Sequence, residues 1–129
     1  MDRRYMKSLE EFVKKRSSSI AIDDLTRELY QKGVSYTNIA KVLTSTDSDF
    51  LDIDFALERG AGAPLNERVR ALFYGAGADY IDIVETVIKT DGSEEGEIEG
   101  ISNPPKEEII KALREIGATD EEIGQAIWF

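Results

Sequence analysis

The side chains that could do chemistry in this chain are carboxylates, lysines, tyrosines and hydroxyls, because the sequence contains neither histidine nor cysteine. This composition excludes thiol nucleophiles, imidazole bases, disulfides and the common zinc sites. Carboxylate pairs remain, such as Asp79 with Asp82 and Glu121 with Glu122, but they fall at expected helix starts, which acidic residues stabilise. Neither a phosphate-binding glycine loop nor a nucleophile elbow is present. We therefore expect a protein that is not an enzyme, with no cofactor and no metal site.

The densest group of carboxylates is an aspartate-rich segment before and within an expected helix. It consists of Asp47, Asp49, Asp52 and Asp54. One interpretation is an array that imitates phosphates and occupies a basic channel on another protein. A calcium loop is a second interpretation, but Asp52 stands where such a loop needs glycine. The third is an ordinary solvated acidic face.

Charge is unevenly distributed along the chain. The sequence has 26 acidic and 16 basic residues, a formal charge of -10, which disfavours nucleic acid and anionic membranes and favours a basic protein surface as partner. The start of the chain is the exception, because it is basic. Its candidate nucleic-acid arm consists of Arg3, Arg4, Lys14, Lys15 and Arg16. The simpler interpretation of the same residues is a solvated helix face.

The chain falls into register with itself when it is aligned on Gly33, Gly77 and Gly117. Apolar residues then recur eight and four positions before each glycine and six and ten positions after it. They are Leu25, Val69 and Ile109; Leu29, Phe73 and Leu113; Ile39, Ile83 and Ile123; and Leu43, Val87 and Ile127. This spacing is typical of two helices that each bury one face. The glycine ends the first helix in the left-handed conformation, and a serine, aspartate or threonine two residues later caps the second.

These repeats predict a single helical domain over residues 1–129. Residues 1–16 form a basic N-terminal helix; 22–60, 64–90 and 104–129 form hairpin units, the first including a further helix over 48–59; and 91–103 form an acidic flexible loop. An isolated hairpin cannot bury enough apolar surface to offset its loss of conformational entropy, so the units must share a core. We expect an all-α, compact bundle of about seven helices that contains three repeated helix-turn-helix hairpins.

The first hairpin also resembles a known DNA-binding fold. The segment at 29–43 is similar to the front of a helix-turn-helix domain of the resolvase or sigma-factor type, through its glycine turn, the Ser35 cap and the Ile39-Ala40 pair. The resemblance extends over residues 25–59 and implies that the next helix enters the major groove. Here that helix is acidic rather than basic, and its carboxylates would repel phosphates instead of binding them.

Aromatic residues offer candidate anchors for a protein interface. Tyr36 and Tyr80 begin the second helices of their hairpins at equivalent positions, and Trp128 and Phe129 end the chain. Buried aromatic rings are favoured in the centres of interfaces. The same rings could instead cover the turns or close the core.

Together these observations predict a non-catalytic acidic protein, expected in the cytoplasm, that binds a basic surface of another macromolecule. It would act as an inhibitor or nucleic-acid mimic of the phage or viral accessory type. Two alternatives stay open: a DNA-binding regulator that uses the basic N-terminal arm, and a structural subunit, or homo-oligomer, within a larger viral assembly. No apolar run long enough for a membrane span occurs in the sequence.

Overall fold

The computed structural model describes residues 3–92 and 106–127, which form eight α-helices and no strand, so the predicted all-α class is confirmed. The helices are α1 (Arg3–Arg16), α2 (Ile22–Gln31), α3 (Tyr36–Leu43), α4 (Phe50–Ala61), α5 (Leu65–Tyr74), α6 (Tyr80–Gly92), α7 (Lys106–Glu115) and α8 (Asp120–Ala126). This is one helix more than the approximate count expected from the sequence.

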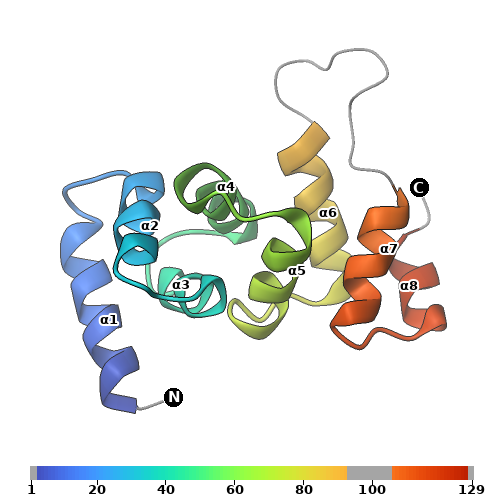
Figure 1. The fold of residues 1–129 in the computed structure, drawn as a ribbon, viewed down its shortest axis with the longest axis horizontal. Helices are drawn as coiled ribbons and strands as arrows, with labels where there is room; N and C mark the ends of the chain where they lie inside the picture. The colour runs from blue at the N-terminus through green and yellow to red at the C-terminus, as the bar shows by residue number, and fades with distance from the viewer. Residues whose placement is uncertain (1–2, 93–105, 128–129) are drawn as a thin grey trace.

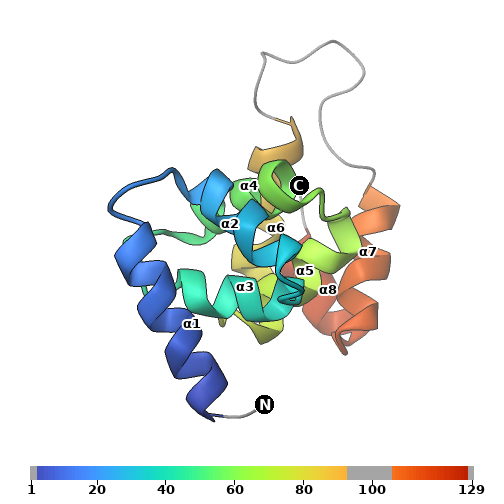
Figure 2. The ribbon, with the colours of Figure 1, turned by 60° about the vertical axis from the view of Figure 1, so that its left-hand side comes forward.

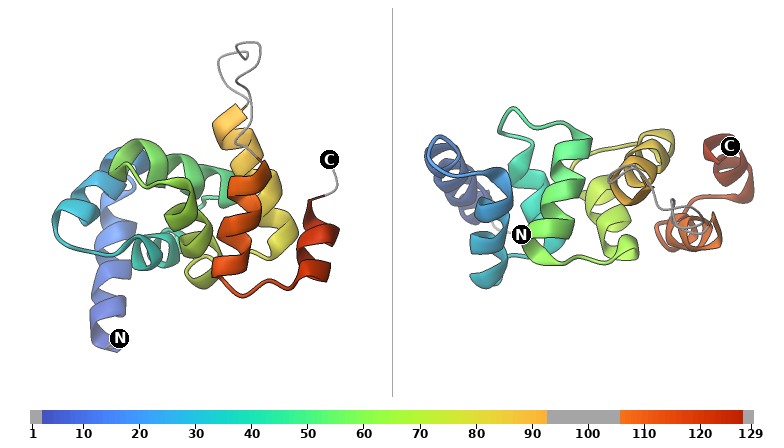
Figure 3. Two further views of the ribbon diagram at one scale, coloured as in Figure 1. Left: turned by 45° about the vertical axis from the view of Figure 1, so that its right-hand side comes forward. Right: turned by 90° about the horizontal axis from the view of Figure 1, so that it is seen from above.

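Each helix packs mainly against the helix two positions away in the chain. The odd row is α1, α3, α5 and α7, and the even row is α2, α4, α6 and α8. The chain advances along the long axis of the molecule, from α1 at one end to α7 and α8 at the other (Figure 1; from above in Figure 3). The buried apolar side chains of the two rows form one continuous core.

Three glycine turns have the geometry that their spacing predicts. Gly33, Gly77 and Gly117 have φ angles of +92°, +80° and +98°, in the left-handed region. The apolar residues at the four recurring positions around each glycine are buried, except that Phe73 is partly exposed. The second helices are capped as expected. The Ser35 hydroxyl accepts the backbone N–H of Asn38, the Asp79 carboxylate accepts that of Asp82, and Thr119 forms a capping box with Glu122.

A fourth left-handed glycine, Gly62 (φ +70°), joins α4 to α5. The positions eight before and six after it, which are aliphatic at the other three turns, hold Asp54 and Arg68. Both side chains are buried, and Arg68 Nε donates to Asp54 Oδ1 over 3.0 Å. Arg68 Nη1 also donates to the Ala63 carbonyl oxygen over 3.2 Å and lies 3.7 Å from Glu58 Oε2. This corrects the prediction for Asp54, which belongs to an internal ion pair and not to an acidic surface.

Two other glycines allow helix backbones to approach closely. A Cβ on Gly60 of α4 would collide with the Asp23 carbonyl oxygen of α2, and a Cβ on Gly75 would collide with the Thr37 carbonyl oxygen of α3. Gly60 thus lies at a contact within the even row, and Gly75 lies where the end of α5 meets the start of α3 in the odd row. Any larger residue at either position would push the two elements apart.

Two boundaries differ from the sequence expectation. The helix expected over 48–59 begins at Phe50, because Asp49 is its N-cap. The loop expected over 91–103 begins later, since α6 continues to Gly92; residues 93–103 lie outside the part of the chain that the structure describes. Among the described helices, none combines the length and apolarity that a membrane crossing requires.

Candidate functional site

The first glycine turn carries a pair of stacked tyrosines. The rings of Tyr30, from the end of α2, and Tyr36, from the start of α3, are nearly parallel, with centroids 5.1 Å apart. The Tyr36 hydroxyl donates to the Tyr30 hydroxyl over 3.3 Å. This hydrogen bond, followed by desolvation and the negative charges of ionised Tyr30 and of Glu67, raises the pKa of Tyr36 to about 12. The predicted anchor Tyr36 is therefore half-buried beneath a more exposed ring.

The second glycine turn has a related aromatic cluster. Tyr80 stacks on Phe73, with centroids 5.2 Å apart, and Tyr74 meets Phe73 edge-on at 4.9 Å. Desolvation raises the pKa of Tyr80, and the negative charge of Glu122 adds to the shift. The Tyr74 ring is 56% exposed, while Tyr80 is partly buried. The predicted anchors Tyr36 and Tyr80 are thus the inner members of their clusters, and Tyr30 and Tyr74 are the solvent-exposed outer members.

The third glycine turn places an ion pair where the first has its tyrosines. Arg114, three residues before Gly117, and Asp120, three residues after it, lie 3.0 Å apart. The turns are also neighbours in space. Gly75 abuts α3 close to the first turn, and the Tyr74 hydroxyl donates over 3.4 Å to the Ile116 carbonyl oxygen, beside the third. We call this succession of three turns the turn edge; its surface side chains are Tyr30, Tyr36, Phe73, Tyr74, Tyr80, Arg114 and Asp120.

An open hollow borders the first turn. Its lining includes Tyr30 and Tyr36 of the turn and Glu67 and Arg70 of α5. Glu67 is partly buried, and Arg70 is exposed. No salt bridge joins Glu67 or Arg70 to another residue within the described chain. Aromatic rings, one carboxylate and one guanidinium therefore line this hollow, and neither charged group has a salt bridge within the described residues.

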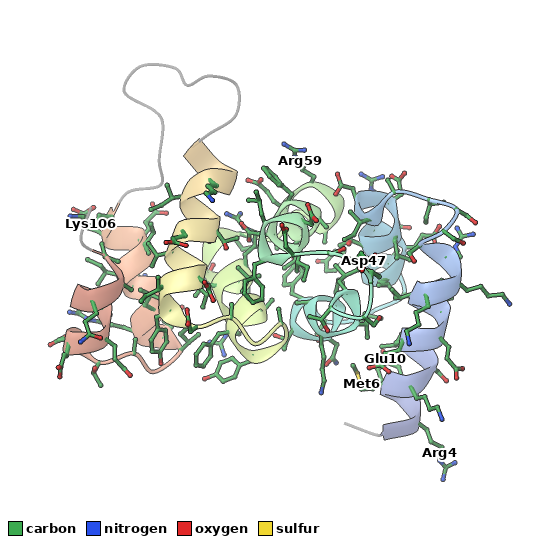
Figure 4. The ribbon with its side chains drawn as sticks, turned by 180° about the vertical axis from the view of Figure 1, so that it is seen from behind. Arg4, Met6, Glu10, Asp47, Arg59 and Lys106 are labelled. Carbon is green, nitrogen blue, oxygen red and sulfur yellow. The ribbon has the colours of Figure 1, made fainter. Side chains whose placement is uncertain are left out.

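The aspartate-rich segment lies elsewhere, beside the α1–α2 connection. Asp47 lines a hollow with Ser17 and Ile20 of that connection, and Figure 4 shows it between α1 and α4. Asp49 and Asp52 form a reciprocal capping box at the start of α4. All three aspartates are exposed, and none has a salt bridge within the described residues. Among the described residues, no three side chains that could bind a metal ion lie close together.

All the basic residues of the N-terminal arm belong to α1, which occupies one end of the molecule (Figure 2). Lys14 and Lys15 are exposed, and Arg4 projects outward from the tip of the helix (Figure 4). Arg16 is only partly exposed, and its guanidinium forms a 2.7 Å salt bridge with Glu28 that links α1 to α2. Arg3 is the first residue of α1, but its side chain lies outside what the structure describes, as do Trp128 and Phe129.

The structure thus separates the predicted site residues into an acidic segment, the turn edge and the α1 arm. Tyr30, Phe73 and Tyr74, which contact the two predicted anchors, and Glu67 are not among the site residues predicted from the sequence. Tyr30 and Tyr74 could have been found, since they lie three residues before their glycines, just as the anchors lie three after. Glu67 belongs to a different hairpin, and no local spacing indicates its position.

Comparison with protein-family models, with curated proteins and with solved structures gave no match to this chain.

Proposed function

We propose that this protein is a non-catalytic binding protein that docks on a basic surface of another macromolecule. The observation that carries the proposal is the set of three exposed carboxylates, Asp47, Asp49 and Asp52, which no described cation neutralises in a chain of formal charge -10. Such a surface attracts cationic partners and raises their association rate.

The exposed tyrosines support docking to a protein rather than to a free ion. Tyr30 and Tyr74 are 45% and 56% exposed, and each belongs to a preformed aromatic cluster. A ring already held by its neighbours loses little conformational entropy on binding, which is one reason that tyrosine is favoured in interfaces. In a cell, occupation of a partner's basic surface would exclude nucleic acid from it, which is the inhibitor or mimic role.

The DNA-binding alternative rests on different residues. It needs the lysines of α1, since α4, which takes the place of a reading helix, packs against α2, α5 and α6 and buries Ile53, Ala56 and Leu57 in the core. The residues that α4 exposes include Asp52 and one cation, Arg59, which Figure 4 shows pointing outward. A side chain that reads DNA must reach base edges with donors such as arginine or asparagine.

Fluorescence anisotropy with two labelled probes separates these functions. One probe is a peptide of alternating arginine and glycine, and the other is a duplex oligonucleotide, each titrated with the full chain at low, physiological and high salt. We expect peptide binding that weakens with added salt, and no duplex binding at physiological salt. Duplex binding without peptide binding at that salt would overturn the proposal in favour of the regulator.

A matched pair of variants tests whether the acidic segment contributes. Asp47→Asn with Asp52→Asn removes two charges, while the amide oxygen introduced in place of the Asp52 carboxylate can still accept the capping N–H. Glu85→Gln with Glu108→Gln removes two charges from exposed positions on α6 and α7. We expect the first variant to weaken peptide binding more than the second. Equal weakening by both would mean that net charge, and not this segment, determines affinity.

A further inference from the structure

We infer that the hollow at the first glycine turn is a binding site for an arginine side chain of a basic peptide segment, held between the Tyr30 ring and the Glu67 carboxylate. The inference rests on the proposed function, because it names a second site, apart from the aspartate-rich segment, and the chemistry through which that site recognises a basic partner.

The aromatic half of the site is preformed. Tyr36 covers one face of the Tyr30 ring, and the 45% exposure of Tyr30 leaves the other side accessible to solvent. A guanidinium is planar and weakly hydrated, so it stacks on a tyrosine face more readily than an ammonium does. The stack on Tyr36, to which the hydrogen bond between the two hydroxyls adds, holds the Tyr30 ring in place before any ligand arrives.

The acidic half of the site is Glu67. This carboxylate lines the same hollow as the two tyrosines, and it is partly buried and has no salt bridge in the described chain. Its negative charge acts on Tyr36, since it contributes to the raised pKa of that residue. A carboxylate beside an aromatic face offers a guanidinium both stacking and a bidentate ion pair.

Arg70, on the rim of the same hollow, limits which ligands fit. Its guanidinium repels a second cation, so the incoming arginine must pair with Glu67 and keep away from Arg70. Arg70 can in turn pair with a carboxylate or a backbone carbonyl of the same peptide. The site therefore suits an arginine within a peptide better than a free cation.

The adjacent turn presents a similar combination. Tyr80 stacks on Phe73, and Glu122 of α8 is close enough for its charge to raise the pKa of Tyr80. Because the two turns are neighbours on the turn edge, a segment with more than one arginine can meet both clusters. This favours an arginine-rich segment over an isolated side chain as the ligand.

The test compares the arginine–glycine peptide with the same peptide in which every arginine is lysine, by anisotropy with the full chain. Charge is equal in the two probes, so a preference for arginine reports stacking and bidentate pairing. We expect at least about threefold tighter binding of the arginine peptide, and a further loss of about three- to tenfold for Tyr30→Ala and for Glu67→Gln. Tyr30→Phe, which keeps the aromatic face, should retain most of the affinity.

Two control variants match these changes elsewhere on the surface. Tyr5→Ala removes an exposed tyrosine of α1, and Glu85→Gln removes an exposed carboxylate of α6. Both should bind the arginine peptide within about twofold of the wild-type protein, and circular dichroism should show all variants folded. If the two peptides bind equally, or if Tyr30→Ala and Glu67→Gln bind like the controls, the hollow is not the site, although the proposed function survives. If neither peptide binds, both proposals fail.

Discussion

The buried ion pair between Asp54 and Arg68 yields a quantitative prediction about stability. Its two residues occupy positions that are aliphatic at the other three glycine turns, so an apolar pair is compatible with this architecture. We consider Asp54→Leu, Arg68→Met and the double variant. Both side chains are at most 4% exposed, which means that removal of one partner leaves a charge with little access to water.

The two single variants should differ in cost. Arg68→Met leaves the Asp54 carboxylate buried without its guanidinium, which should destabilise the fold by about 3–5 kcal/mol. Asp54→Leu should cost less, about 2–3 kcal/mol, because Arg68 keeps its hydrogen bond to the Ala63 carbonyl and lies near Glu58. The double variant removes both charges, and it should be within about 1 kcal/mol of the wild-type protein or more stable.

Urea unfolding followed by far-ultraviolet circular dichroism measures all four free energies of unfolding. The double-mutant cycle should give a coupling energy of about 4 kcal/mol or more. An unchanged dependence on urea would show that the variants unfold from similarly compact states. The reasoning is refuted if both single variants cost less than about 1 kcal/mol, or if their costs simply add in the double variant.

Gly60→Ala should destabilise the protein by about 1–3 kcal/mol in urea unfolding, because the added Cβ meets a carbonyl oxygen of α2. Gly124→Ala, which has open space around it, should instead stabilise α8 by about 0.5–1 kcal/mol. A change of the same sign in both variants would contradict this packing. The pKa of Tyr36 is raised to about 12, so this residue stabilises the fold fully below pH 10 and loses its contribution as the pH rises through 12. Tyr30→Phe removes the hydroxyl that accepts the hydrogen bond, and it should bring the pKa of Tyr36 toward 10 in a titration of tyrosinate absorbance. An unchanged pKa would exclude the hydrogen bond as the main cause of the shift. Thr119→Ala should lower the free energy of unfolding by about 1 kcal/mol, while Thr119→Ser should be nearly neutral; equal losses would show that the cap hydroxyl is not responsible.

The sequence predicted the parts of the fold that follow from local spacing. The glycines at 33, 77 and 117 each combine a left-handed position, a cap two residues later and apolar residues at helical intervals, and these requirements are met within one hairpin. The packing of each helix on the helix two positions away was not predicted. It depends on contacts such as that of Gly60 with α2, which lie far apart in the chain and leave no periodic signal.

The candidate site was predicted only in part, for a similar reason. Tyr36 and Tyr80 were recognised as matched positions, but stacking is a property of ring direction, which spacing alone does not determine. Asp54 was assigned to the surface because aspartate in an acidic segment is usually solvated. Alignment on Gly62 would have placed it at a buried position opposite Arg68, but that turn lacks the aliphatic pattern by which the other three were recognised.

The arrangement of the helices in two rows has a consequence for how the molecule opens. Since most contacts join helices that are close in the chain, α1 or the α7–α8 pair can detach while the packing of α3, α4 and α5 persists. Amide exchange would then be fastest at both ends and slowest in the middle. The same locality allows a chain of this kind to gain or lose a pair of helices without rebuilding its centre.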